Sequence, residues 1–245
     1  MKQKTISYLD FSGLYKEESE NILNRFSLSP SDIKLIDLCS VPSTNCYCDN
    51  HAASVIREKL NSESPSGIHF LDSGNYHYAT IFFLEKIEYD FALFLIDNHP
   101  DIQPPAFGDI LSCGGWIYDA LNRLPHLKEV YMAGVNPVLI EEVSPLPDTI
   151  KVISSGSDIS TCKTSLPLYI SVDKDALSEK YAASDWDQGT MELKQLTGLL
   201  SYLDSESDVI GIDICGEKKN DPTAEEILLN RATNTTILST LLDIH

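Results

Sequence analysis

The sequence has few basic residues for its length. Of 245 residues, 18 are Lys or Arg and 37 are Asp or Glu, which gives a formal net charge of −19 at pH 7. A surface with this charge repels phosphate backbones and anionic lipid, so we expect neither nucleic acid nor a membrane as a partner. An acidic surface attracts cations instead, either metal ions or a basic substrate, although it also simply keeps a protein soluble. We expect a small-molecule substrate.

Long hydrophobic runs are also absent. The longest apolar stretches have the length of a β-strand, which excludes a transmembrane helix. Residues 1–20 turn acidic and lack the apolar core of a signal peptide. These features predict a cytoplasmic protein, in which the six cysteines stay reduced.

The cysteines lack the spacing of a structural zinc site. Cys39, Cys46 and Cys48 form a C-x6-C-x-C pattern, and no second C-x2-C pair completes a site of the usual kind. The other three stand alone in the sequence: Cys113, Cys162 and Cys215.

The remaining composition is that of an ordinary globular protein. Apolar residues make up 42% and charged residues 22%, and there is no long linker, internal repeat or low-complexity segment. The length is sufficient for one large α/β domain, so we expect residues 1–245 to form a single domain.

Short β-branched or aromatic runs alternate with helical patterns. Several of the runs are apolar at consecutive positions, which is typical of strands that are covered on both faces. The predicted strands are 5–11, 33–38, 67–71, 91–97, 129–135, 149–154, 168–173 and 209–214.

The helical patterns have apolar residues three and four positions apart. They predict helices over 51–60, 78–86, 110–124, 191–203 and 223–242. Pro222 suits the start of the last helix, with Asp221 as its cap. The alternation predicts an α/β fold with a parallel sheet of about eight strands between two layers of helices.

Two strand ends are unusually polar. The run FALFLI is followed by Asp97-Asn98-His99-Pro100-Asp101, and LYISV is followed by Asp173-Lys174-Asp175. Ligands of parallel sheets bind beyond the carboxyl ends of the strands. Because side chains alternate in extended backbone, Asp97, His99 and Asp101 point one way, and Asp173 and Asp175 share a face.

Four converging carboxylates repel each other unless cations lie between them. Carboxylate and imidazole ligands suit Mn²⁺, Fe²⁺ or Zn²⁺, and an oxygen-rich set favours Mn²⁺. Taken separately, the segment 98–101 is also typical of a turn, and Asp173 and Asp175 are also typical of a solvated strand end or a helix cap. Their combination at two strand ends predicts a pair of metal ions.

These motifs resemble those of the ureohydrolase family, the arginase and agmatinase group. That family has D-x-H-x-D at one strand end and S-x-D-x-D at a later one, which correspond here to 97–101 and 171–175. It also has a glycine-rich loop with a His, here 72–77, and a later loop that ends in Gly-Thr, here 185–190. The order and spacing match from about Gly67 to Gly216.

The resemblance implies a three-layer α/β/α fold, two Mn²⁺ ions and attack of a metal-bridging hydroxide on a guanidinium or similar carbon, with loss of urea or an amine. It also implies roles for six residues. His77 would bind the first metal, Asp97 and Asp173 would bridge, and Asp101 would bind the first metal and orient the hydroxide as the catalytic residue. His99 and Asp175 would bind the second metal.

The sequence departs from the family pattern where substrate contacts are expected. The family usually has a proton-shuttle His beyond D-x-H-x-D, but here that region has no His. Ser112 or Cys113 are candidates to line the pocket, and the alternative for Cys113 is a buried, inert thiol. Asp187, in the 185–190 loop, is a third candidate for a substrate contact.

The family also places a Glu three residues after an Asp in the last strand. Here Glu217 comes four residues after Asp213, with Gly216 at the expected position. Glu217 either reaches the substrate through a bulge at Gly216 or lies on the surface beside Lys218 and Lys219.

The segment 46–51 is a further candidate to form a wall of the same cleft, or a third metal site. We expect structural or exposed roles for His69, His126 and His245. The leading hypothesis is a binuclear metal hydrolase of a non-peptide C–N bond in a guanidino, amidino or related compound. The alternatives are a one-zinc deacetylase-like enzyme and a metal-binding protein without catalysis. The resemblance also suggests a homo-oligomer.

Overall fold

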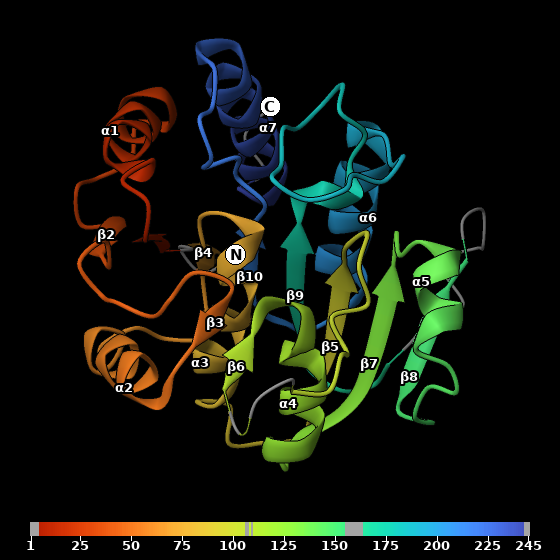
Figure 1. Ribbon diagram of the computed structural model, residues 1–245. Helices are drawn as coiled ribbons and strands as arrows, with labels where there is room; N and C mark the ends of the chain where they lie inside the picture. The colour runs from red at the N-terminus through yellow and green to blue at the C-terminus, as the bar shows by residue number, and fades with distance from the viewer. Residues whose placement is uncertain (1–4, 106–107, 109, 155–163, 243–245) are drawn as a thin grey trace.

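The computed structural model describes residues 5–105, 108, 110–154 and 164–242. Eight strands form one sheet in the order β2-β1-β4-β10-β9-β5-β7-β8, and each pair of neighbours is parallel (Figure 1). The strands are β1 (Ile6–Asp10), β2 (Ile33–Asp37), β4 (Ile68–Phe70), β5 (Phe91–Ile96), β7 (Leu127–Ala133), β8 (Ile150–Ile153), β9 (Leu168–Asp173) and β10 (Val209–Cys215).

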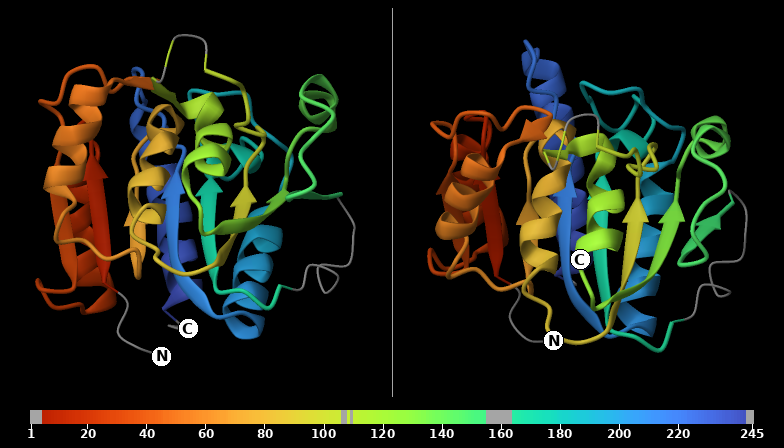
Figure 2. Two further views of the ribbon diagram at one scale, coloured as in Figure 1. Left: turned by 90° about the horizontal axis from the view of Figure 1, so that it is seen from below. Right: turned by 60° about the horizontal axis from the view of Figure 1, so that its bottom comes forward.

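Helices cover both faces of the sheet (Figure 2). One core cluster contains side chains from α2 (Asn50–Lys59), α3 (Thr80–Leu84) and α4 (Trp116–Arg123). The other contains side chains from α1 (Tyr15–Phe26), α6 (Leu193–Glu206) and α7 (Ala224–Leu241). The predicted three-layer α/β/α fold is therefore confirmed.

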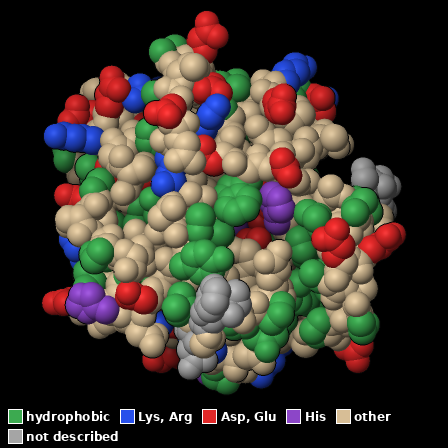
Figure 3. Space-filling model, in the orientation of Figure 1, with side chains coloured by type: hydrophobic (Ala, Val, Ile, Leu, Met, Phe, Trp, Pro, Cys, Tyr) green, Lys and Arg blue, Asp and Glu red, His purple; other side chains and the backbone are tan. Residues whose placement is uncertain are grey.

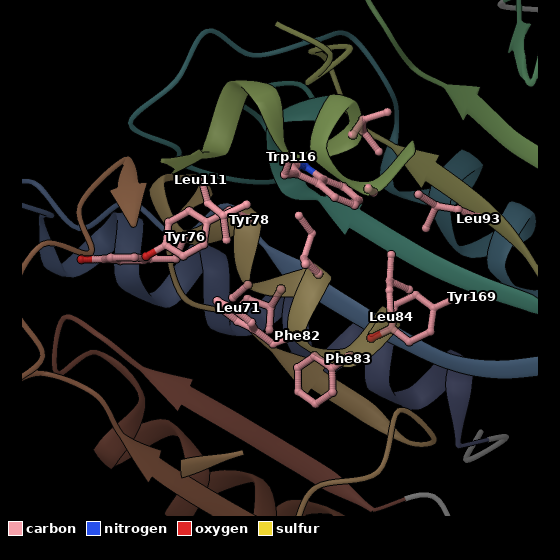
Figure 4. Close-up of a cluster of buried hydrophobic side chains, with 14 of the residues drawn as sticks. Leu71, Tyr76, Tyr78, Phe82, Phe83, Leu84, Leu93, Leu111, Trp116 and Tyr169 are labelled. Atoms are coloured by element: carbon pink, nitrogen blue, oxygen red, sulfur yellow. The ribbon is translucent and has the colours of Figure 1, made fainter. Parts of the chain in front are cut away.

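The central strands are apolar on both faces because both faces are covered. β5 and β9 are buried at every position. In β5, Leu93 and Leu95 point to the α4 side, and Phe94 and Ile96 point to the α6 side. Figure 4 shows part of the α4-side layer, in which Trp116, Phe82 and Tyr169 fill the space between helices and sheet.

Each of the eight predicted strands is present, but some other segments differ from the prediction. Residues 110–124 are not one helix, because β6 (Leu111–Ser112) pairs antiparallel with β3 (Tyr47–Cys48) before α4 begins. The last helix is capped by Thr223, whose side chain accepts from Glu226 N, and not by Asp221, so that prediction was wrong. α1 and α5 (Pro137–Glu142) were not predicted.

Among the described residues, no helix is long and apolar enough to span a bilayer. The topology brings three strand ends together, since β9 lies between β5 and β10. Ile96 is in register with Val172, and Cys215 is in register with Asp173. The residues that follow β5 therefore lie beside the end of β9.

Candidate metal centre

Three strand ends and a short helix position the polar cluster. Asp97 follows β5, Asp173 ends β9, and His77 lies in the 3-10 helix η1 (Gly74–Ala79), which follows β4. Asp175 lies in a second 3-10 helix, η4 (Lys174–Ala176), which follows β9. This helix begins there because the Asp173 carboxylate accepts a hydrogen bond from Asp175 N.

His77, Asp97 and Asp101 form the first group of candidate ligands. His77 Nδ1 lies 3.3 Å from Asp97 Oδ2, 3.1 Å from Asp101 Oδ2 and 3.7 Å from Asp173 Oδ2. Asp101 reaches this position because its backbone has φ 47°, in the left-handed region that aspartate tolerates better than most residues.

Asp97, His99 and Asp175 form the second group. His99 Nδ1 lies 2.9 Å from Asp175 Oδ2 and 3.5 Å from Asp97 Oδ1. In each group the candidate ligand atoms all lie within 4.8 Å of one another. Asp97 belongs to both groups, one oxygen facing His77 and the other facing His99. The arrangement suits two adjacent cations that share one carboxylate.

The electrostatics of the cluster also favour cations. Burial and then the Asp97 charge raise the pKa of Asp175 to about 7. Burial, followed by the Asp101 charge, raises the pKa of Asp97 above its ordinary value. Burial lowers the pKa of His99, but its hydrogen bonds with Asp175 and Asp97 overcome this and raise it to about 11. The raised pKa values of these groups mean that the cluster favours added positive charge, which a metal ion would supply in place of protons.

Two buried polar atoms of the candidate ligands have no hydrogen-bond partner. They are His77 Nδ1 and Asp97 Oδ2, on side chains that are each 1% exposed. An unsatisfied buried polar atom costs about 1–3 kcal/mol, so such atoms are rare without a function. Both face the first group of ligands, and a divalent metal ion would satisfy both, so the residues present fit a metal.

Further hydrogen bonds orient the candidate ligands. His77 Nε2 lies 2.9 Å from Ser171 Oγ, which donates to Asp213 Oδ1 at 2.6 Å. This chain favours the proton on Nε2 and leaves the Nδ1 lone pair free for a metal. On the other side, Trp116 Nε1 donates to Asp101 Oδ2 at 2.8 Å.

The cluster lies at the base of a cavity of about 290 Å³. Figure 3 shows histidine and acidic side chains recessed near the middle of one face and framed by hydrophobic side chains. The lining includes Asp97, His99, Asp101, Asp173 and Asp175. Its other members are Cys46, Tyr47, Gly74, Pro100, Gln103, Ser112, Cys113, Gly114, Leu139, Glu142, Val143 and Trp186.

Of the three candidate substrate residues, Cys113, Asp187 and Glu217, only Cys113 lines the cavity among the described residues. Cys113 and its neighbour Ser112 line the cavity. Asp187 is exposed and is not part of the lining; its backbone carbonyl accepts from Asn98 Nδ2 at 2.9 Å.

Both predictions for Glu217 were wrong. Its side chain is buried, but it forms an ion pair with Lys174 and accepts from Asn234 Nδ2 at 2.8 Å, away from the cavity. The reason is Gly216, which has φ 95° and comes so close to Asp173 that a Cβ would lie 2.3 Å from its Oδ1. The chain turns at this glycine and directs Glu217 to the opposite side of η4.

The 46–51 segment forms part of the pocket wall, as predicted. Cys46 and Tyr47 line the cavity because β3 pairs with β6. Within the described ranges, no candidate ligand group includes Cys46, Cys48 or His51, so a third metal site is not found there.

The remaining histidines have the expected roles where they are described. His69 is buried against Phe83 and lies 2.6 Å from Ser7 Oγ, and His126 is exposed beside Asp90. His245 and Cys162 lie outside the described residues.

Residues near the site that escaped the sequence analysis include Glu142 and Trp186, which line the cavity, and Cys215, whose Sγ donates to Asp173 Oδ2 at 3.1 Å. Cys215 lies there because β10 is in register with β9. The others depend on loop conformations that spacing does not specify.

Comparisons with known proteins agree with this geometry. No family model matches the sequence. A Thermotoga maritima protein described as uncharacterized is 29% identical over 219 residues, which cover 86% of this chain and 79% of that protein.

Solved structures give wider coverage at lower identity. Proclavaminate amidino hydrolase from Streptomyces clavuligerus has a TM-score of 0.70 at 11% identity, covering 99% of this chain and 93% of that one. Arginase from Bacillus cereus has a TM-score of 0.68 at 13% identity, covering 97% and 98%. A triple mutant of a T. brucei arginase-like protein bound with Mn²⁺ has a TM-score of 0.61 at 14% identity, covering 97% and 90%.

The structural neighbours span almost the whole chain at low identity, and they include arginases, agmatinases and an amidino hydrolase. This chain, with its eight-stranded parallel sheet between helices, therefore has the arginase fold.

Proposed function

We propose that this protein is a metal-dependent hydrolase that cleaves a non-peptide C–N bond in a small cationic molecule, with two metal ions at the base of the cavity. The observation that carries the proposal is the pair of ligand groups that share Asp97, together with the unpartnered buried atoms His77 Nδ1 and Asp97 Oδ2.

His77, Asp97 and Asp101 would hold the first ion, and Asp97, His99 and Asp175 the second, with Asp173 between them. When bound, the two ions would supply Lewis-acid activation of a water molecule at neutral pH. Mn²⁺ is the expected metal, and the Mn²⁺-bound T. brucei protein of the same fold supports it. Fe²⁺ and Zn²⁺ also suit carboxylate and imidazole ligands.

Asp101 is the catalytic residue in this proposal. Its Oδ2 faces His77 and is held by Trp116 Nε1, and the residue also lines the cavity. It can therefore orient a nucleophilic water from the pocket side. Cys113 lines the cavity in the region where the family has a proton-shuttle His, but its hydrogen bond with Cys46 and its burial raise the pKa of its thiol, which disfavours it as a replacement for that His.

The lining favours a cationic substrate. None of the described lining residues is Lys or Arg, and Glu142 adds a carboxylate above the metal ligands. Tyr47 and Trp186 supply aromatic faces, against which cationic groups pack favourably. The net charge of −19 also attracts cations toward the cavity. Guanidino, amidino and amine-bearing amide compounds fit these features.

Metal content and turnover test the proposal. The purified protein, loaded separately with Mn²⁺, Fe²⁺ and Zn²⁺, is analysed by elemental mass spectrometry and assayed against guanidino, amidino and acyl-amine compounds. We expect two ions per chain and release of urea, ammonia or an amine. Asp97→Asn and Asp173→Asn should lose most metal and all turnover, and Asp90→Asn, an exposed carboxylate, should retain both.

The alternatives give different results. One zinc ion per chain with release of acetate would favour a deacetylase-like enzyme. Two firmly bound ions with no turnover of any compound would favour a binding protein. Full metal occupancy in Asp97→Asn would contradict the assignment of the site itself.

A further inference from the structure

Among the five cysteines that the structure describes, Cys215 is the one that lies directly against the candidate metal ligands. β10 is in register with β9, so Cys215 and Asp173 are neighbours on the same face of the sheet. The Cys215 side chain is fully buried, and its Sγ donates to Asp173 Oδ2 at 3.1 Å. Parallel pairing between two strand ends therefore fixes the sulfur beside a proposed bridging carboxylate.

The same sulfur also lies near His77. Cys215 Sγ, a ring nitrogen of His77 and an Asp173 oxygen all lie within 4.8 Å of one another. An independent observation points to a ligand here, because His77 Nδ1 is buried without a hydrogen-bond partner and faces this cluster. A cation at the first position would therefore have imidazole, carboxylate and sulfur donors within reach.

We infer that Cys215 is a thiolate ligand of the first metal ion, which makes that position a nitrogen, oxygen and sulfur site. This inference rests on the proposed metal centre and adds one ligand to it. On metal binding, the thiol proton that Asp173 now accepts in a hydrogen bond is released to solvent, and the sulfur takes up the metal. Asp173 then keeps both oxygens for metal ions.

The position of Cys215 is compatible with catalysis. Neither Cys215 nor His77 lines the cavity, whereas Asp97, Asp101 and Asp173 do. The sulfur would thus occupy the buried side of the ion and leave the cavity side for water and substrate. Gly216 contributes to this arrangement, since a side chain there would collide with Asp173 and displace the end of β10.

A sulfur ligand changes the metal preference. Thiolates bind zinc and iron better than manganese, which prefers carboxylate and water oxygen. The first position should therefore select Zn²⁺ or Fe²⁺ over Mn²⁺, while the second position, with Asp97, His99 and Asp175, keeps the oxygen-rich character that suits Mn²⁺.

Cobalt spectroscopy tests the inference. The full chain is loaded with Co²⁺, its cobalt content is measured, and the near-ultraviolet spectrum is recorded for a sulfur-to-cobalt charge-transfer band. We expect the band in the unaltered protein and its loss in Cys215→Ser, which keeps the hydrogen-bond donor but removes the thiolate. Cys113→Ser and Cys39→Ser are the controls, and both should retain the band.

The outcomes separate this inference from the proposed function. Bound cobalt without the band, or a band that survives in Cys215→Ser, would overturn the role of Cys215 and leave the metal centre intact. Absence of cobalt from every protein would overturn both. If Cys215→Ser does not fold, X-ray absorption of the zinc-loaded unaltered protein decides, since a Zn–S shell at about 2.3 Å is expected and a shell of nitrogen and oxygen alone contradicts it.

Discussion

Substitution of Lys174 should destabilise the protein strongly. This residue lies between Asp173 and Asp175, but its side chain points to the opposite side of η4, where it is 0% exposed. Its ammonium group contacts the Glu217 carboxylate and donates to Asn234 Oδ1 at 2.8 Å. Asn234 Nδ2 in turn donates to Glu18 Oε1 at 2.7 Å.

Lys174→Met should leave the buried Glu217 carboxylate without its cation. The Glu217 side chain is 6% exposed, so water compensates little for the loss. Removing one partner of a buried ion pair costs about 3–5 kcal/mol. For a chain of this size, that corresponds to a fall in Tm of about 6–20 °C. Lys218→Met breaks a pair with Glu226 that is open to solvent, so it should destabilise the protein much less than Lys174→Met.

Urea-induced unfolding of the metal-free protein measures this difference. Excess chelator is present throughout, so that metal binding adds nothing to the free energy of unfolding. Replacing both partners, as in Lys174→Met with Glu217→Leu, should recover most of the lost stability because no unpaired charge remains there. If Lys174→Met costs no more than Lys218→Met, the buried network does not stabilise the fold and the explanation for Glu217 fails.

Three other predictions concern single groups. Burial and then the Glu217 charge raise the pKa of Glu18 to about 7, so this group favours the folded state below its unfolded pKa and loses that contribution as pH rises toward 7. The free energy of unfolding of Glu18→Gln, relative to that of the unaltered protein, should therefore rise by about 3 kcal/mol between pH 4 and pH 8. The same difference between the two proteins at both pH values would contradict this. Ser171→Ala removes the partner of His77 Nε2 and should weaken metal affinity about 10- to 100-fold in chelator competition, whereas equal affinity would show that Ser171 does not orient the imidazole. A hydrogen bond from Cys113 and the charge of Lys219 lower the pKa of Cys46 to about 7 against the effect of burial. Alkylation of Cys46 by iodoacetamide should therefore reach half its maximal rate near pH 7, and this midpoint should move to higher pH in Cys113→Ala, which removes the hydrogen-bond donor.

The sheet was predictable because its strands are buried on both faces. The runs FALFLI and LYISV are buried at every position and, apart from Ser171, are made of apolar or aromatic residues. α1 was missed because no side chain caps its start, although Glu17 and Glu18 in its first turn favour a helix. β3 and β6 are two residues long, too short for any periodicity.

The candidate ligands were predictable for a related reason. Asp97 and Asp173 each follow an apolar strand, and alternation along the chain places His99 and Asp175 beside them. Glu217 was not predictable, because the φ of Gly216 decides its direction. Cys215 required the register between β10 and β9, which no local pattern contains.

Anomalous diffraction from crystals of the metal-loaded protein would test the central claim most directly. Data collected on either side of the absorption edge of the metal would locate each ion independently of the protein atoms. We predict two peaks about 3.5–4 Å apart, one on each side of the Asp97 carboxylate, with His77 beside one and His99 beside the other. A cavity without a peak in excess metal, or a single peak that Asp97 does not contact, would contradict the account.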